Sequence, residues 1–110
     1  MTVGSKKKAP ARKKQIQPSK GLEKQLGEVV REVREEKDIS QDGLAREMNT
    51  DRTTISLIER GLRSPYIRTL MQIGAALDVP PSEILRRLER RLGTDWRTMM
   101  AESRKRRAAP

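Results

Sequence analysis

Hydrophobic residues recur along this chain at helical spacing. From Leu22 to Val33 they fall at i, i+4, i+7, i+8 and i+11, which predicts one amphipathic helix over residues 22–37. Two shorter helices are expected at 41–48 and 51–60. The chain has no Asn-Gly pair and no run of alternating β-branched residues, so we expect no strand.

Prolines divide the second half of the chain into two further predicted helices, at 66–77 and 81–92. The buried side of the first is expected to comprise Ile67, Leu70, Met71, Ile73, Gly74 and Leu77, and the second carries Ile84, Leu85, Leu88 and Leu92 on one side. Beyond Gly93, Trp96 to Met100 can form one more turn. The sequence therefore predicts a compact all-α domain of five helices over 21–92, followed by an extension over 93–110.

The turn between the two shorter helices has its own signals. Ser40 and Asp51 are placed to cap the two helices with their side-chain oxygens. Asn49 tolerates the left-handed backbone conformation that a tight turn requires. Ala45 is a small residue where the two helices meet, and Gly61 ends the second. The stretch 41–61 therefore predicts a helix, a tight turn and a helix.

Charge is distributed unevenly along the 110 residues, whose formal net charge is +10. Residues 1–20 hold seven basic residues and no acidic ones, 86–110 hold nine against three, and 21–85 hold nine against twelve. Residues 1–20 also have few apolar side chains and contain two prolines, so we predict a disordered basic arm. Such an arm is attracted to polyphosphate or to an anionic membrane. The arm residues expected to contact DNA are Lys6, Lys7, Lys8, Arg12, Lys13 and Lys14.

Several kinds of chemistry are disfavoured by composition. The chain has no Cys and no His, which excludes disulfides and the usual zinc sites and removes the commonest general base. No Gly-rich phosphate loop is present, so neither an enzyme nor a bound cofactor is expected. No apolar run approaches the ~20 residues of a membrane span, and no secretory signal begins the chain. We therefore expect a cytoplasmic, nucleoid-associated protein with no membrane partner.

These residues together resemble the Cro/phage-repressor (Xre-type) helix-turn-helix family over roughly 22–90. The resemblance is carried by VREVREE at 30–36, ISQ at 39–41, Leu44-Ala45, DRTTIS at 51–56, IERG at 58–61, RSP at 63–65, Thr69-Leu70, Ala75-Ala76-Leu77 and Val79. It implies a DNA-binding domain whose second motif helix lies in the major groove of double-stranded DNA, with its first residues at the base edges.

The resemblance assigns the base-reading positions to Arg52, Thr53, Ser56 and Leu57. Arg52 can donate two hydrogen bonds to a guanine, and Thr53 can bond a base or contact a thymine methyl. Leu57 stands where the family often has a polar residue. It either contacts a thymine methyl or packs in the core.

Phosphate contacts are implied for Gln41, which begins the first motif helix, and for Thr54, Arg60 and Arg63. The alternative for each of these residues is an ordinary solvated side chain with no DNA contact. The family pattern also pairs Arg34 with Glu59 as an internal ion pair, which is a structural role.

Regulators of this kind act as symmetric dimers on two half-sites. A self-complementary patch is expected from Leu85, Leu88, Leu92, Trp96, Met99 and Met100, unless these side chains are used in the domain's own core. The favoured function is a sequence-specific transcriptional regulator, a repressor or autoregulator, of a phage, plasmid, toxin–antitoxin or restriction–modification locus. The alternatives are an antitoxin that binds a toxin or other protein partner, and an architectural protein that coats nucleic acid.

Overall fold

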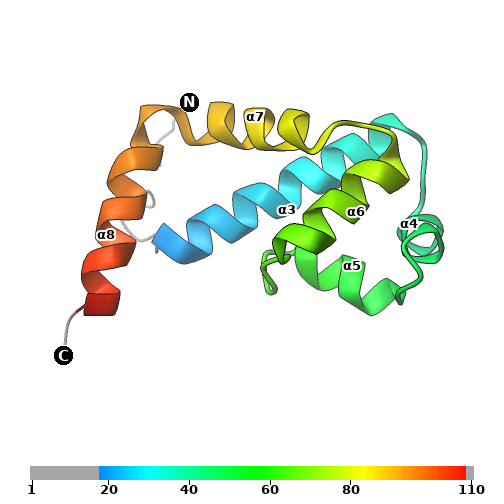
Figure 1. The fold of residues 1–110 in the computed structure, drawn as a ribbon, viewed down its shortest axis with the longest axis horizontal. Coiled ribbons are helices and arrows are strands. Elements are labelled where there is room, and N and C mark those ends of the chain that lie inside the picture. The colour runs from blue at the N-terminus through cyan, green and yellow to red at the C-terminus, as the bar shows by residue number, and fades with distance from the viewer. Residues whose placement is uncertain (1–17, 109–110) are drawn as a thin grey trace, which may run out of the picture.

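The computed structural model describes residues 18–108, with side chains from 21 to 102. Every regular element in this part of the chain is helical, so the predicted all-α fold is confirmed. The elements are α3 (Pro18–Glu36), α4 (Gln41–Glu47), α5 (Arg52–Glu59), α6 (Ile67–Leu77), α7 (Pro81–Leu92), the 3₁₀ turn η1 (Gly93–Asp95) and α8 (Trp96–Ala108) (Figure 1). The arm residues Lys6, Lys7, Lys8, Arg12, Lys13 and Lys14 lie outside the described residues.

Two boundaries differ from the prediction. Helix α3 begins at Pro18, four residues earlier than expected, because a proline in the first turn of a helix needs no N–H and already has a helical φ. The extension was expected to hold one helical turn and then a basic tail, yet α8 continues for 13 residues to Ala108. Helix α8 turns away from α7 and lies beside the first turns of α3 (Figure 1).

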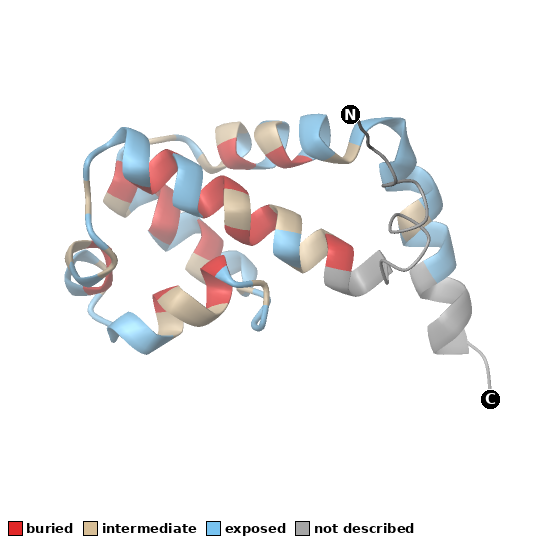
Figure 2. Ribbon diagram, turned by 180° about the vertical axis from the view of Figure 1, so that it is seen from behind, coloured by how far each residue is buried: buried red, intermediate tan, exposed pale blue. Residues whose placement is uncertain are grey.

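The core lies where α3, α5, α6 and α7 meet, and the buried sides of these helices turn toward one another (Figure 2). Helix α3 contributes the apolar stripe that its spacing predicted, and Leu22 at its edge is only partly buried. The largest fully buried side chains are Leu44, Ile55, Ile58, Ile73, Leu77, Ile84, Val29, Val30 and Val33. The two short motif helices are therefore held by packing against the longer ones.

Two residues predicted as buried are exposed instead: Ile67 and Met71 are 70% and 53% exposed. Leu85, which was expected in the dimer patch, is 45% exposed. Successive residues of a helix are rotated by about 100°, so one helix cannot turn all of its apolar positions toward the same neighbours. Helix α6 buries Leu70, Ile73, Gly74 and Leu77, which leaves Ile67 and Met71 outside that face.

The helix caps and the left-handed turn residues of the motif form as predicted. The Oγ of Ser40 accepts from the N–H of Gly43, and Oδ1 of Asp51 accepts from the N–H of Thr54, each at 2.9 Å. Asn49 has a φ of 56° and Gly61 a φ of 76°. A Cβ on Gly61 would lie only 2.7 Å from Cα of Lys24, so this turn needs both the left-handed conformation and the missing side chain.

Opposite charges join α7 to α3. Arg87 donates to Glu36 at 2.8 and 3.0 Å and to Glu32 at 3.3 Å, and Arg91 contacts Gln25 and Glu28. Hydrogen bonds to Glu36, the largest cause, and to Glu83 raise the pKa of Arg87 above its usual range. Arg87 and Arg91 therefore link α7 to α3.

Candidate nucleic-acid interface

Helix α5 is held against α3 by a close backbone contact. A Cβ built on Gly27 of α3 would lie 2.4 Å from the carbonyl oxygen of Ile58 and 2.5 Å from that of Glu59. The missing side chain lets the two helices approach at the point where α5 ends. Because Ile55 and Ile58 are buried on the same side, the opposite side of α5 faces away from the core.

Arg34 and Glu59 form the ion pair that the family resemblance implies. Nε of Arg34 donates to Oε2 of Glu59 at 2.6 Å, and Nη2 donates to Oε1 at 3.0 Å. Nη1 of Arg34 also donates to the carbonyl oxygen of Ile39 at 2.8 Å. The hydrogen bonds that Arg34 donates to Glu59 are the main reason that the pKa of Arg34 is raised. The pair therefore joins α3 to the last residue of α5 and to the segment that leads into α4.

Gln41 makes two contacts that sequence reasoning did not foresee. Its Nε2 donates to Oε1 of Glu59 at 2.9 Å, and its Oε1 accepts from Nε of Arg52 at 3.3 Å. A Gln at the start of a helix gives no signal of such contacts in the sequence, because its neighbours are set by how α4 crosses α5. The amide thus connects the first motif helix with both ends of the second.

The four predicted base-reading residues lie on the accessible side of α5. Arg52 and Thr53 are exposed, and Ser56 and Leu57 are half-buried. The start of this side is fixed by the Asp51 cap, and the hydrogen bonds from Thr54 lower the pKa of Asp51, with a further contribution from the positive charge of Arg63. This side offers hydrogen-bond donors, hydroxyl groups and one aliphatic surface.

The predicted phosphate residues are all at least partly accessible. Arg60 and Arg63, which follow α5 in the chain, are exposed, while Gln41 and Thr54 are half-buried. The charge of Arg63 acts on Asp51, the cap at the start of α5. Arg68, in the first turn of α6, is a further exposed cation that the sequence did not single out.

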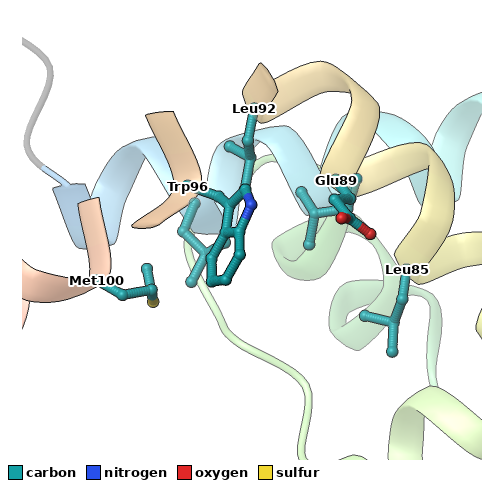
Figure 3. A pocket seen from close by; sticks show the side chains of 7 residues that line it. Leu85, Glu89, Leu92, Trp96 and Met100 are labelled. Atoms are coloured by element: carbon teal, nitrogen blue, oxygen red, sulfur yellow. The ribbon is translucent and has the colours of Figure 1, made fainter. Parts of the chain in front are cut away.

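The expected dimer patch falls on an open apolar groove of about 290 Å³ formed by α3, α7 and α8. Figure 3 shows Leu85, Leu92, Trp96 and Met100 converging on it. Leu88 also lines the groove but is buried in the domain's own core, and Met99 does not line it. Leu22 and Glu89 also line the groove and were not predicted.

The chain is similar in sequence and in fold to known proteins. The family model described as helix-turn-helix matches residues 30–84. Control protein C.BamHI of Bacillus amyloliquefaciens is 42% identical over 61 residues, which is 54% of this chain and 75% of that protein. The restriction-modification controller protein C.AhdI of Aeromonas hydrophila superposes with a TM-score of 0.58 at 31% identity, covering 59% of this chain and 94% of that one.

The fold is also similar to that of the clp gene regulator ClgR of Corynebacterium glutamicum. That structure superposes with a TM-score of 0.59 at 24% identity, and the match covers 61% of this chain and 86% of the other. At this identity the similarity concerns the fold alone. The described residues contain no helix with the length and apolar character needed to cross a membrane.

Proposed function

Because the chain belongs to the helix-turn-helix family and is a DNA-binding transcriptional regulator, we propose that it is sequence-specific and reads the major groove through α5. The observation that carries this proposal is the orientation of α5. Its apolar side is fixed by Ile55, Ile58 and the Arg34–Glu59 pair, so its polar side is presented outward. In helix-turn-helix proteins the first residues of this helix meet the base edges.

Within this proposal, Arg52 donates to a guanine and Leu57 contacts a thymine methyl group. Arginine is the commonest partner of guanine O6 and N7, and an aliphatic side chain has only the thymine methyl to recognise in the major groove. Leu57 is half-buried, so part of its side chain packs in the domain and part remains accessible. Thr53 and Ser56 supply hydroxyl groups between them.

Phosphate contacts in the proposal come from Gln41, Thr54, Arg60 and Arg63, all of which are exposed or half-buried. Sequence-independent affinity comes mainly from the arm and the basic C-terminal residues, because residues 21–85 carry a net charge of −3. By contrast, 1–20 carry seven basic residues and no acidic ones, and 86–110 carry nine basic against three acidic. Lysines that neutralise phosphates release counterions, so their contribution depends on salt.

We also propose that the regulator is a homodimer joined through the α3–α7–α8 groove. The exposed apolar side chains of Leu85, Trp96 and Met100 stand beside opposite charges: Glu89 lines the groove, and the Arg97 guanidinium lies 5.0 Å from the centre of the Trp96 ring. A surface with apolar side chains and both charge signs can pair with itself across a two-fold axis. The partner that fits is therefore a second copy.

The locus we propose is a restriction–modification system. Two similar proteins are named as a control protein and as a restriction-modification controller, at 42% and 31% identity. Finding the selected DNA site ahead of restriction–modification genes would support this assignment, and finding it ahead of unrelated genes would contradict it.

Selection of bound DNA from a random pool tests the reading mechanism. We expect enrichment of a near-palindromic site whose half-sites lie about 34–36 Å apart, with a guanine whose preference is lost in Arg52→Ala. That loss corresponds to roughly 1–3 kcal/mol of discrimination. A pool with no enriched sequence, together with footprints that cover all DNA evenly, would indicate an architectural protein instead. Co-purification with a toxin, without enriched DNA, would indicate an antitoxin.

A further inference from the structure

We infer that α8 is a second DNA-binding element, whose basic end holds the phosphate backbone of the spacer between the two half-sites. This rests on the proposed function, because it needs a dimer bound to a two-part site. The contact lies outside the part of the chain that the helix-turn-helix family model matches, since that match ends at residue 84 and α8 begins at Trp96.

The charge of α8 is concentrated near its C-terminal end. The last two turns hold Arg104, Lys105, Arg106 and Arg107 in succession, on a helical backbone. Successive positions of a helix are rotated by about 100°, so four in a row cover its whole circumference. Whichever way α8 packs, part of this basic run therefore stands on the outer side of the helix.

The direction of α8 is set by a sharp turn at Gly93. This residue has a φ of 63° and a ψ of −149°, close to a region that is essentially confined to glycine. After the turn, Trp96 and Met100 line the apolar groove together with Leu22 of α3. The first turns of α8 are thus anchored on the start of α3, and the helix then continues past it (Figure 1).

The end of α8 reaches the same edge of the molecule as the accessible side of α5. In Figure 1, α7 runs along the upper edge, α5 lies at the lower edge, and α8 descends to that lower edge; Figure 2 shows the same from behind. Ile55 and Ile58 turn the buried side of α5 toward the core, so its accessible side faces outward there. The molecule is only 24 Å deep along this view, so one duplex laid along the lower edge can meet both helices.

The proposed dimer places α8 beside the two-fold axis, because the groove that joins the two copies is formed by α3, α7 and α8. Half-sites about 34–36 Å apart put each α5 roughly 17–18 Å from that axis. The longest dimension of the molecule is 43 Å, with α4 and α8 at its opposite ends (Figure 1), so this span is available. The basic ends of the two α8 helices therefore converge on the DNA between the half-sites.

Acidic side chains of α3 have other partners. Glu28 contacts Arg91, and Glu36 accepts from Arg87 at 2.8 Å, so both are engaged by α7. A phosphate backbone offers the basic end of α8 a continuous line of negative charge, and cations that contact it release counterions. The alternative role is local, since cations in the last turn of a helix also stabilise its dipole. That role needs no DNA.

Hydroxyl-radical footprinting of the full chain on the selected operator separates the two roles. Arg106→Gln/Arg107→Gln removes two charges and keeps residues of good helix propensity. We expect wild type to protect the backbone of both half-sites and of the spacer, and the variant to protect the half-sites alone. The slope of log affinity against log salt should become shallower by up to about 3.6, for four lost phosphate contacts per dimer at about 0.9 each.

Base preference gives an independent readout. Phosphate contacts carry no sequence information, so the ratio of affinities for the operator and for a base-substituted operator should be the same in wild type and variant. The matched control is Arg86→Gln/Arg90→Gln, which removes two exposed charges from α7, at the upper edge in Figure 1. This control should retain the spacer protection. Thermal melts and circular dichroism verify folding, and a chain ending at Glu102 is the second variant.

Spacer protection that both α8 variants retain, or a wild-type footprint with an unprotected spacer, would overturn the inference and leave the proposed function intact. Protection on the outer flanks of the half-sites that the α8 variants remove would also overturn it, because α8 would then lie far from the two-fold axis. A wild-type chain that selects no operator would instead contradict the proposed function itself.

Discussion

Arg34 and Glu59, 25 positions apart in the chain, form a two-bond ion pair inside the domain, with side-chain exposures of 10% and 2%. The pair joins the end of α5 to α3, the longest helix of the domain. Glu59 also accepts a hydrogen bond from the Gln41 amide. The stability of the fold and the orientation of α5 therefore depend on the same carboxylate.

Removing one partner of this pair should therefore destabilise the fold. In Glu59→Ala the Arg34 charge stays buried without its partner, which costs roughly 3–5 kcal/mol for a buried pair. Urea unfolding measures the loss. The control is Glu35→Ala, whose exposed pair with Arg31 is expected to contribute at most about 1 kcal/mol. A Glu59→Ala protein as stable as wild type would show that the pair is not structural.

Two glycines offer a direct comparison of backbone packing. Gly27→Ala places a Cβ against the carbonyl oxygens of Ile58 and Glu59, which cannot move without shifting α5, so we expect a loss of roughly 1–3 kcal/mol or more. Gly43→Ala meets only the side chains of Ser40 and Ile39, at 3.2 and 3.3 Å, and gains helix propensity. Thermal melts should show a large loss for the first and little change for the second. Equal effects would contradict the close contact of α3 with α5.

Local signals in the sequence predicted the motif well, because its determinants are close together in the chain. The caps at Ser40 and Asp51 and the turn at Asn49 act over three or four residues, so a short stretch is sufficient to identify them. The Arg34–Glu59 pair is a long-range contact, and it was predicted only through resemblance to a family. The eight proposed DNA-contacting residues of the motif stay predictions.

Contacts between distant helices were less predictable. The apolar character of Ile67 and Met71 does not reveal which side of α6 meets the core, because that depends on how α6 crosses its neighbours. The Arg87 contacts with Glu32 and Glu36 and the position of Gln41 likewise depend on the packed arrangement. Periodicity assigns a residue to a helix, whereas tertiary packing decides its partner.

Acid should weaken the cap of α5. The pKa of Asp51 is lowered in the folded chain, mainly by hydrogen bonds from Thr54. Its charge therefore contributes stability that is fully present above its unfolded pKa of about 3.9 and is lost as the pH falls through the lower folded value. Asp51→Asn keeps the capping oxygen without the charge. The urea midpoints of wild type and variant should differ at about pH 7 and converge toward about pH 2. A constant difference would refute the role of the charge.

Deleting residues 1–20 should weaken binding to specific and non-specific DNA by a similar factor. The deletion removes seven basic residues, so the dependence of log affinity on log salt should become shallower. Because α3 begins at Pro18, a deletion of 1–17 keeps the helix whole and serves as the control for damage to the fold. Parallel slopes for the full and the shortened chain would show that the arm does not contact DNA.

The dimer proposal is tested by placing a charge in the groove. Leu85 is exposed in the single chain, so Leu85→Glu should leave the fold intact and prevent a second copy from covering the apolar side chains. Sedimentation of wild type and variant, free and on operator DNA, measures the mass. The matched control is Met71→Glu, at an apolar side chain of similar exposure on α6. We expect a dimer for wild type and for Met71→Glu, and a monomer for Leu85→Glu. If Met71→Glu dissociates the dimer and Leu85→Glu does not, the two copies meet through α6, and a wild-type monomer on DNA would exclude the dimer altogether.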